Sequence, residues 1–168
     1  MVSLFKVRKD SSQCAERWLE LLPELRSKDG GRMKVVLDDG AFMPTRAHDT
    51  DAGLDLYSPV DIMIPGRGDA IIDTGVHIEI PELYAGFLMS KSGLNVKHGI
   101  TSEGVIDAGY TGSVVAKLYN SSYLDYKVNR GDKITQLIVI PVCLPELELV
   151  DRLGDTERGA NGFGSTGK

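Results

Sequence analysis

The chain has 168 residues, of which 42% are hydrophobic and 26% charged, and its formal net charge is −5. This composition is typical of a globular protein with a hydrophobic core and excludes a fibrous or disordered chain. The negative charge argues against direct binding to a nucleic-acid backbone. A phosphorylated small molecule is still compatible with it, because a few local cations, backbone amides or a metal ion can hold phosphate.

Two features of the sequence concern its compartment. No apolar run reaches membrane-spanning length and no signal-peptide core is present, so we expect no membrane association. The expected location is the cytoplasm, with the nucleus, or a host cytoplasm for a viral protein, as alternatives. Cys14 and Cys143 have neither metal-ligand spacing nor a disulfide framework around them, and we expect isolated thiols.

Residues 1–32 differ from the rest of the chain and predict an N-terminal helical extension with a linker. Asp10 and Gln13 have the spacing of a capping box, and Pro23 is expected to kink the helix. One apolar stripe at helical spacing is formed by Ala15, Trp18, Leu19, Leu22 and Leu25. This stripe either packs on its own protein or binds a partner protein through residues 12–26.

Residues 33–153 predict a single all-β domain. Short apolar segments alternate with Gly- and Pro-containing turns, which is typical of a sandwich, jelly roll or barrel. Residues 91–98 are the exception and predict one short helical turn. The expected strands are Lys34–Leu37, Leu54–Tyr57, Val60–Ile64, Ala70–Asp73, 76–80, Tyr84–Met89, Val114–Tyr119, Tyr123–Val128, Ile134–Val142 and Leu147–Val150.

The segment from Gly104 to Gly112 is the strongest candidate for a catalytic site. Asp107 follows an apolar strand end, and Gly109 and Gly112 flank Tyr110, so we expect both side chains on the tight turn of a hairpin. A carboxylate can orient and deprotonate water, and an aromatic ring can wall off a sugar or base. Because Asp and Gly are also ordinary turn residues, a purely structural turn is the alternative.

Other polar residues allow phosphate or metal binding without requiring it. Asp55 belongs to an acidic cluster that lacks the EF-hand spacing, but Mg²⁺ held by water and substrate phosphates needs one such carboxylate. Lys91 and the serines beside it suit phosphate, and Gln136 in an apolar strand needs a hydrogen-bond partner. The three histidines, His48, His77 and His98, have no Cys or His at metal-ligand spacing, and we assign them no role.

The C-terminal segment, residues 154–168, is a glycine-rich tail. Residues 162–168 match the G-x-G-x-x-G pattern and most of a P-loop, but both patterns require a following helix, and we reject them. Glycine amides, hydroxyls and Arg158 can still wrap a triphosphate while Phe163 covers a base. A disordered tail is the alternative.

Together, five segments in order resemble the five motifs of trimeric dUTPases. The resemblance extends from Met33 to Lys168, and five matching motifs in the family's order are highly specific. The segments are Ala52–Ser58, Lys91–Leu94, Gly104–Gly112, Gly131–Gln136 and Arg158–Gly167.

The resemblance implies a distorted jelly roll, or β-clip-like barrel, assembled as a homotrimer with its sites at subunit interfaces. The tail would be a flexible arm that closes over a neighbouring subunit's site. The implied activity is hydrolysis of dUTP to dUMP and pyrophosphate, with Mg²⁺ as cofactor and water attacking the α-phosphate. This reaction limits uracil incorporation into DNA and supplies dUMP for dTMP synthesis.

The resemblance also implies roles at the base and sugar. Asp107 would activate the attacking water and meet the 3′-hydroxyl, and Tyr110 would stack on the deoxyribose and exclude a 2′-hydroxyl. The main chain around Gly104 and Ile106 would read the uracil, and Phe163 of the arm would cover it.

At the phosphates, Asp55 would hold Mg²⁺ through water and Gln136 would bind a water or oxygen near the α-phosphate. The remaining implied substrate-binding residues are Lys91, Ser92, Gly93, Arg158, Gly164, Ser165 and Thr166. Two departures stand out, because Lys91 replaces the family's usual Arg and Thr135 its usual Ala. The rival dCTP deaminases share the fold but generally lack this arm, and a regulatory nucleotide binder is a further alternative.

Overall fold

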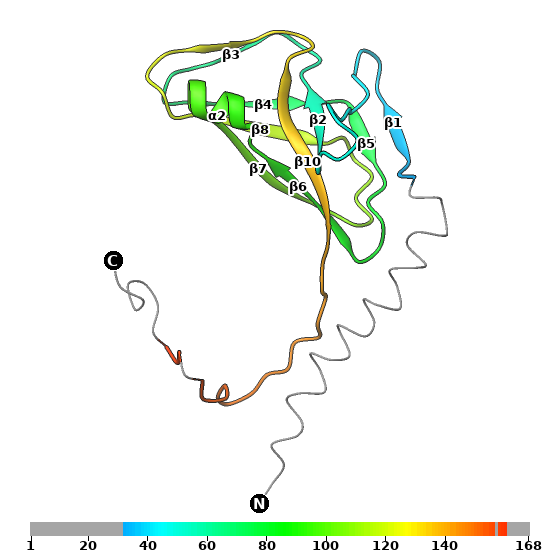
Figure 1. The fold of residues 1–168 in the computed structure, drawn as a ribbon, viewed down its shortest axis with the longest axis vertical. Coiled ribbons are helices and arrows are strands. Elements are labelled where there is room, and N and C mark those ends of the chain that lie inside the picture. The colour runs from blue at the N-terminus through cyan, green and yellow to red at the C-terminus, as the bar shows by residue number, and fades with distance from the viewer. Residues whose placement is uncertain (1–31, 157, 161–168) are drawn as a thin grey trace, which may run out of the picture.

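The described part of the chain, residues 32–156 and 158–160 of a computed structural model, is mostly antiparallel β-structure with one short helix (Figure 1). The predicted helix within 1–32 and the arm residues Phe163 to Thr166 lie outside it. The elements are β1 (Val35–Leu37), β2 (Gly53–Tyr57), β3 (Ile62–Ile64), β4 (Asp69–Asp73), β5 (Val76–Ile78), β6 (Tyr84–Met89), α2 (Ser92–His98), β7 (Ile100–Asp107), β8 (Val115–Asn120), β9 (Tyr126–Val128) and β10 (Lys133–Pro141).

The largest sheet has the strand order β2-β10-β6-β7-β8-β4, with every neighbouring pair antiparallel. This sheet curls (Figure 1). Together with the two-stranded sheets β1-β5 and β3-β9 it spans residues 35–141, called the β-body below. Alternation of buried and exposed residues drives this arrangement, as in β4, where Ala70 and Ile72 point inward and Ile71 outward. The mostly β class predicted from the sequence is confirmed.

Strand β7 changes partner along its length. Residues 100–102 pair with residues 118–120 of β8, whereas residues 103–107 pair with β6. Ile100 therefore packs in one hydrophobic core and Ile106 in another. The first core contains Leu56, Val76, Ile78, Ile80, Leu88, Ile106, Val114 and Leu137. The second contains Ile64, Ala70, Ile72, Ile100, Ala116, Leu118, Val128 and Ile134.

A β-bulge interrupts β10 where it pairs with β2. Lys133 lies opposite Tyr57 and Thr135 opposite Leu56, so the register shifts between them. Such a bulge places an extra residue in one strand and re-aims its side chains. Ile134 and Thr135 are accordingly both buried although they are consecutive. The bulge turns Lys133 toward the carboxylate of Asp55, the partner of Gln136 in the same ladder.

Helix α2 (Ser92–His98) confirms the helical turn predicted for residues 91–98, with Lys91 as its N-cap. Gly99 ends the helix in the left-handed conformation (φ 68°), which glycine adopts at little cost, and its N–H bonds the carbonyl of Asn95. None of the described helices is long and apolar enough to cross a membrane.

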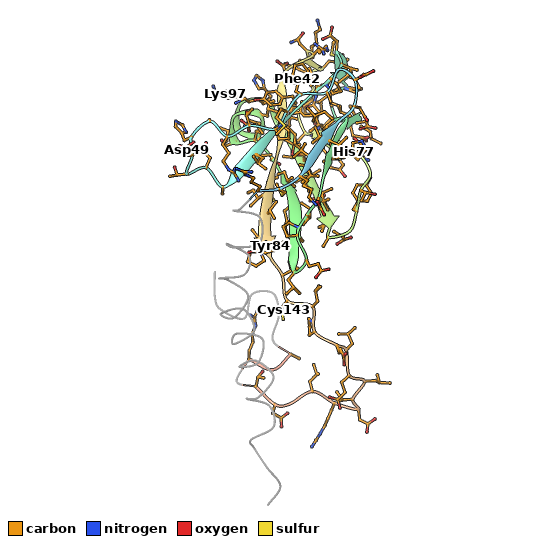
Figure 2. All side chains as sticks on the ribbon, turned by 90° about the vertical axis from the view of Figure 1, so that its right-hand side faces the viewer. Phe42, Asp49, His77, Tyr84, Lys97 and Cys143 are labelled. Carbon is orange, nitrogen blue, oxygen red and sulfur yellow. The ribbon has the colours of Figure 1, made fainter. Side chains whose placement is uncertain are left out.

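Two expectations for the chain beyond β10 are wrong. Leu147–Val150 is not a strand, because the chain after Pro141 leaves the β-body (Figure 1) and no described strand there offers its edge. Leu147 and Leu149 are 97% and 100% exposed. Cys143, labelled below Tyr84 in Figure 2, is disulfide-bonded and not an isolated thiol. Sequence separation alone does not report whether a cysteine meets a partner in space.

Candidate active site

The turn after β7 presents Asp107 and Tyr110, as the sequence predicts. The N–H of Tyr110 donates to the carbonyl of Asp107 (3.2 Å), and Gly109 has a φ of +87° that favours glycine. The Asp107 carboxylate is exposed at the end of the strand, and Tyr110 is 46% exposed. A carboxylate and an aromatic ring therefore share one turn at the surface.

The hairpin around this turn is open. Pairing between β7 and β8 stops at Ser102, and within the described chain no strand pairs with the second edge of residues 103–107. Gly104 and Ile106 lie on this stretch, with the Ile106 side chain in the first core. Peptide groups on an unpaired edge keep hydrogen-bonding capacity. The edge can therefore serve a ligand that carries donors and acceptors in a plane, such as a nucleobase.

Gly112 leaves room for the Tyr110 ring. A Cβ at residue 112 would lie 2.3 Å from the Tyr110 hydroxyl oxygen, closer than atoms can approach. The same hydroxyl donates to the carbonyl of Ser113 (3.0 Å). The ring thus lies over its own turn, and only glycine leaves room for it there.

A second cluster forms around Asp55, which is 6% exposed. Its carboxylate is ion-paired with Lys91 through one oxygen and with Lys133 through the other, at 2.8 Å for Lys133. Burial alone raises the pKa of Asp55, but the hydrogen bonds and charges of Lys133 and Lys91 outweigh it and the net pKa is lowered. The hydrogen bond to Asp55 raises the pKa of Lys133.

Gln136 and the residues beside it are held by a hydroxyl network. The Gln136 side-chain amide donates to the carbonyl of Ser90 (3.1 Å). Thr135 donates to the carbonyl of Met89 (3.0 Å) and its hydroxyl lies 2.6 Å from that of Ser102. The partner that the Thr135 hydroxyl requires is therefore present, and the segment leading into Lys91 is anchored to two strands.

Ser92 and Gly93 form the first turn of α2, directly after Lys91. The first amides of a helix have no partner within it, so they can meet an anion. A Cβ at Gly93 would meet nothing within 4 Å, so this glycine leaves the backbone open to approach. Arg158, by contrast, lies on the segment beyond β10 that has left the β-body (Figure 1).

The two clusters do not meet within one chain. Asp107 lies opposite Ala85 of β6, whereas Gln136 lies opposite Met89 at the other end of the same pairing. At about 3.3 Å per residue, this register separates them by roughly 13 Å along the strand. One chain therefore holds two separate clusters, one at Asp107 and one at Asp55.

The side chains around Asp55 could bind Mg²⁺ only in a limited way. Among the described residues, no group of three or more His, Cys, Asp or Glu side chains could hold a metal ion. Both oxygens of Asp55 already face ammonium groups. Mg²⁺ keeps several waters and takes its other ligands from phosphates, so a water-mediated contact with Asp55 fits this donor set and a protein cage does not.

Sequence reasoning missed two residues near these clusters. Lys133 completes the charge cluster around Asp55, and His77 contacts the turn that carries Tyr110. Lys133 lies within the motif Gly131–Gln136, and this position could have indicated that it belongs to the site. Nothing in the sequence connects His77 with Thr111, since their contact depends on the tertiary fold.

Known proteins are similar to this chain in sequence and in fold. The dUTPase family model matches residues 39–167. A deoxyuridine 5′-triphosphate nucleotidohydrolase of Rattus norvegicus is 38% identical over 99% of this chain and 82% of its own length. One from Tropheryma whipplei is 42% identical over 79% of this chain and 94% of its own length. The dUTPase of Staphylococcus bacteriophage 80alpha with dUpNHpp aligns with a TM-score of 0.77 and 32% identity, covering 82% of this chain and 99% of the phage chain.

The chain therefore belongs to the dUTPase family. Membership confirms the function predicted from the sequence, that of a dUTP nucleotidohydrolase, a hydrolase of nucleotide metabolism.

Proposed function

We propose that this dUTPase hydrolyses dUTP to dUMP and pyrophosphate by attack of water on the α-phosphate, with Asp107 as the group that orients the water and accepts its proton. The observation that carries the proposal is the exposed Asp107 carboxylate on the same turn as the Tyr110 ring, beside an open strand edge. Water activation by a carboxylate requires this accessibility. The reaction would limit dUTP and supply dUMP.

Selection of deoxyuridine follows from the same turn. The unpaired edge around Gly104 and Ile106 would hydrogen-bond the uracil through main-chain groups. The Tyr110 ring, held over Gly112, would stack on the deoxyribose and leave no space for a 2′-hydroxyl. A wall that excludes an atom discriminates against the wrong substrate by steric overlap.

The phosphate chain would extend toward the cluster around Asp55. Lys91, Ser92 and Gly93 would contact phosphate oxygens, and Gln136 would hold a water or oxygen near the α-phosphate. When bound, Mg²⁺ supplies charge neutralisation on the phosphates, with Asp55 holding it through water. The structure of a mutant phage phi11 dUTPase, 32% identical to this chain, reveals the coordination of a structural Mg(II) ion, so at least one relative binds this metal.

A homotrimer would bring the separated clusters together. The distance between Asp107 and Gln136 in one chain is explained if each site combines the Asp107 cluster of one subunit, at the base, with the Asp55 cluster of another, at the phosphates. The segment after β10 supports this, because Leu147, Leu149 and Leu153 are almost fully exposed and exposed apolar residues in a row indicate a protein interface. In the trimer the β-domain, residues 33–153, would form the distorted jelly roll.

The arm, residues 154–168, would then close over a neighbouring subunit's site. Arg158, Gly164, Ser165 and Thr166 would clasp the distal phosphates and Phe163 would cover the uracil. Such a closing segment excludes water and completes the site only with substrate bound. Removal of residues 159–168 should abolish most turnover while the trimer persists in size-exclusion chromatography; dissociation would assign the arm a structural role.

The test of the reaction uses the wild-type protein with Mg²⁺ and, separately, dUTP, dCTP, dTTP or UTP, with product identification. We expect dUMP and pyrophosphate from dUTP alone. Deamination of dCTP would favour the rival enzyme of the same fold. Asp107→Asn should retain dUTP binding and lose on the order of 10²-fold or more in kcat, whereas Asp49→Asn, in an exposed loop, serves as the control. Normal turnover by Asp107→Asn would exclude this carboxylate as the base.

A further inference from the structure

His77 of β5 contacts the turn that carries Tyr110. Its Nδ1 lies 2.8 Å from the carbonyl oxygen of Thr111, and its Nε2 lies 3.3 Å from a carboxylate oxygen of Asp38 in the turn after β1. A carbonyl and a carboxylate can only accept hydrogen bonds. Both contacts are therefore hydrogen bonds at once only when the ring carries a proton on each nitrogen, that is, as imidazolium.

The contact lies within the turn itself. Thr111 lies between Tyr110 and Gly112, on the stretch where β7 and β8 have parted. At its far end the turn is fastened by the Ser113 hydroxyl, which bonds the Asp73 carboxylate, and by Val114, whose N–H bonds the carbonyl of Val76 (2.8 Å). Between Tyr110 and these fastenings, among the residues that the structure describes, His77 is the side chain that ties the turn to the β-body.

We propose that His77 is a positioning residue for substrate selection, holding the Tyr110 turn in place through Thr111 while Asp38 holds the ring. This inference rests on the proposed function, because it assigns the Tyr110 turn to the deoxyribose of dUTP. His77 does not touch the reacting atoms. It acts by restricting where the Tyr110 ring lies, so its loss weakens substrate binding and selection more than the chemical step.

The surrounding charges favour the doubly bonded form. Asp38 and Asp73 face the ring, and the next charged side chains along β1 and β5 are Lys34 and Glu79, which pair with each other at 2.9 Å. The hydrogen bond to Thr111, followed by that to Asp38, raises the pKa of His77 above its ordinary 6.5. The clamp is thus complete below the raised pKa, and one of its two bonds is lost as the pH rises through it.

The experiment measures KM and kcat for dUTP from pH ~6 to ~9, across the ordinary histidine range, in wild type, His77→Gln and His48→Gln. His48 is a matched control, since it also faces a carboxylate, that of Asp51 at 3.3 Å. Its neighbour Asp49 lies on the other side of the β-body from His77 (Figure 2). Titration of the nucleotide is common to all three proteins and cancels in the ratios.

We expect His77→Gln to raise KM about three- to tenfold at the acidic end, the effect of one lost hydrogen bond, with kcat changed less. The ratio to wild type should be smaller at the alkaline end, where the neutral ring of the wild-type protein keeps only one of its two hydrogen bonds. UTP should become a better substrate relative to dUTP. His48→Gln should follow the wild-type profile. The proposal would be overturned if the KM of His77→Gln followed that of wild type at every pH. A variant that differed from wild type only in its melting temperature would overturn it as well.

Asp38→Asn provides a second route that leaves His77 in place. It removes the charge that stabilises the imidazolium, so the wild-type rise in KM should occur at lower pH. An unchanged transition in this variant would refute the role of Asp38. A wild-type protein that does not turn over dUTP would instead refute the proposed function. Normal wild-type turnover with unaltered His77→Gln kinetics refutes only the inference.

Discussion

The ammonium nitrogen of Lys133 lies 2.8 Å from Oδ2 of Asp55, on the opposite carboxylate oxygen from Lys91. The Asp55 side chain is 9% exposed, whereas the two lysines are 40% and 25% exposed. A nearly buried anion between two cations joins β2, β10 and the start of α2. Removal of its charge leaves two ammonium groups facing each other.

Asp55→Asn should therefore lower the free energy of unfolding at neutral pH by about 2 kcal/mol. Because the folded pKa of Asp55 is below 3.8, the stabilisation is complete above the unfolded pKa and is lost as the pH falls below 3.8. The melting temperatures of variant and wild type should thus differ at pH 7 and converge in acid. Equal differences at both pH values would contradict the ion-pair account, and Asp49→Asn is the exposed control.

Lys91→Arg should lower KM for dUTP between about two- and tenfold. A guanidinium has five N–H donors in a planar fork, so it can keep the ion pair with Asp55 and also donate to a phosphate oxygen. The ammonium group of lysine is less suited to bind both at once. Steady-state kinetics with saturating Mg²⁺ measure the effect, with Lys97→Arg on the exposed side of α2 as control. An unchanged or higher KM would indicate that Lys91 binds only Asp55 and does not contact the phosphates.

Gly112→Ala should weaken the discrimination between dUTP and UTP by roughly tenfold, since a Cβ would displace the Tyr110 ring that now lies over residue 112. Melting temperature should change little because the turn lies at the surface. The kcat/KM ratio for the two nucleotides is the measurement. Tyr110→Phe keeps the ring and loses only its bond to Ser113, so its effect should be smaller; the reverse order would contradict a steric gate.

Thr135→Ala should reduce stability by about 1 kcal/mol, because it leaves the buried Ser102 hydroxyl short of a partner. Ser102→Ala should cost a similar amount. The double variant should cost less than the sum, with a coupling of about 0.5 kcal/mol or more for residues in contact. Urea unfolding of the four proteins measures this cycle, and strict additivity would indicate that the two hydroxyls do not interact.

Much of the fold could be predicted from local patterns. The strand around Ile78 follows from alternation and those around Ile72 and Leu88 from short apolar segments between turns, whereas the Asp107–Tyr110 turn follows from its glycines. These features depend on residues near one another in the sequence. The function was predictable because five motifs occur in the order of one family.

The remaining features depend on contacts between distant segments. The bulge that aims Lys133 at Asp55 and the change of partner of β7 at Ser102 are properties of strand register, which periodicity does not specify. Leu147 and Leu149 have strand-like alternation, yet a strand forms only where a partner edge is available. His77 meets Thr111 only because β5 and the end of β7 fold together.

The parting of β7 from β8 at Ser102 has a kinetic consequence. The Tyr110 turn can move without breaking any ladder bond of residues 100–107, since its fastenings are the few bonds of residues 111–114. Amide hydrogens of residues 108–113 should then exchange with solvent far faster than those of β7 that pair with β6. Substrate entry and product release are thereby uncoupled from the unfolding of either core.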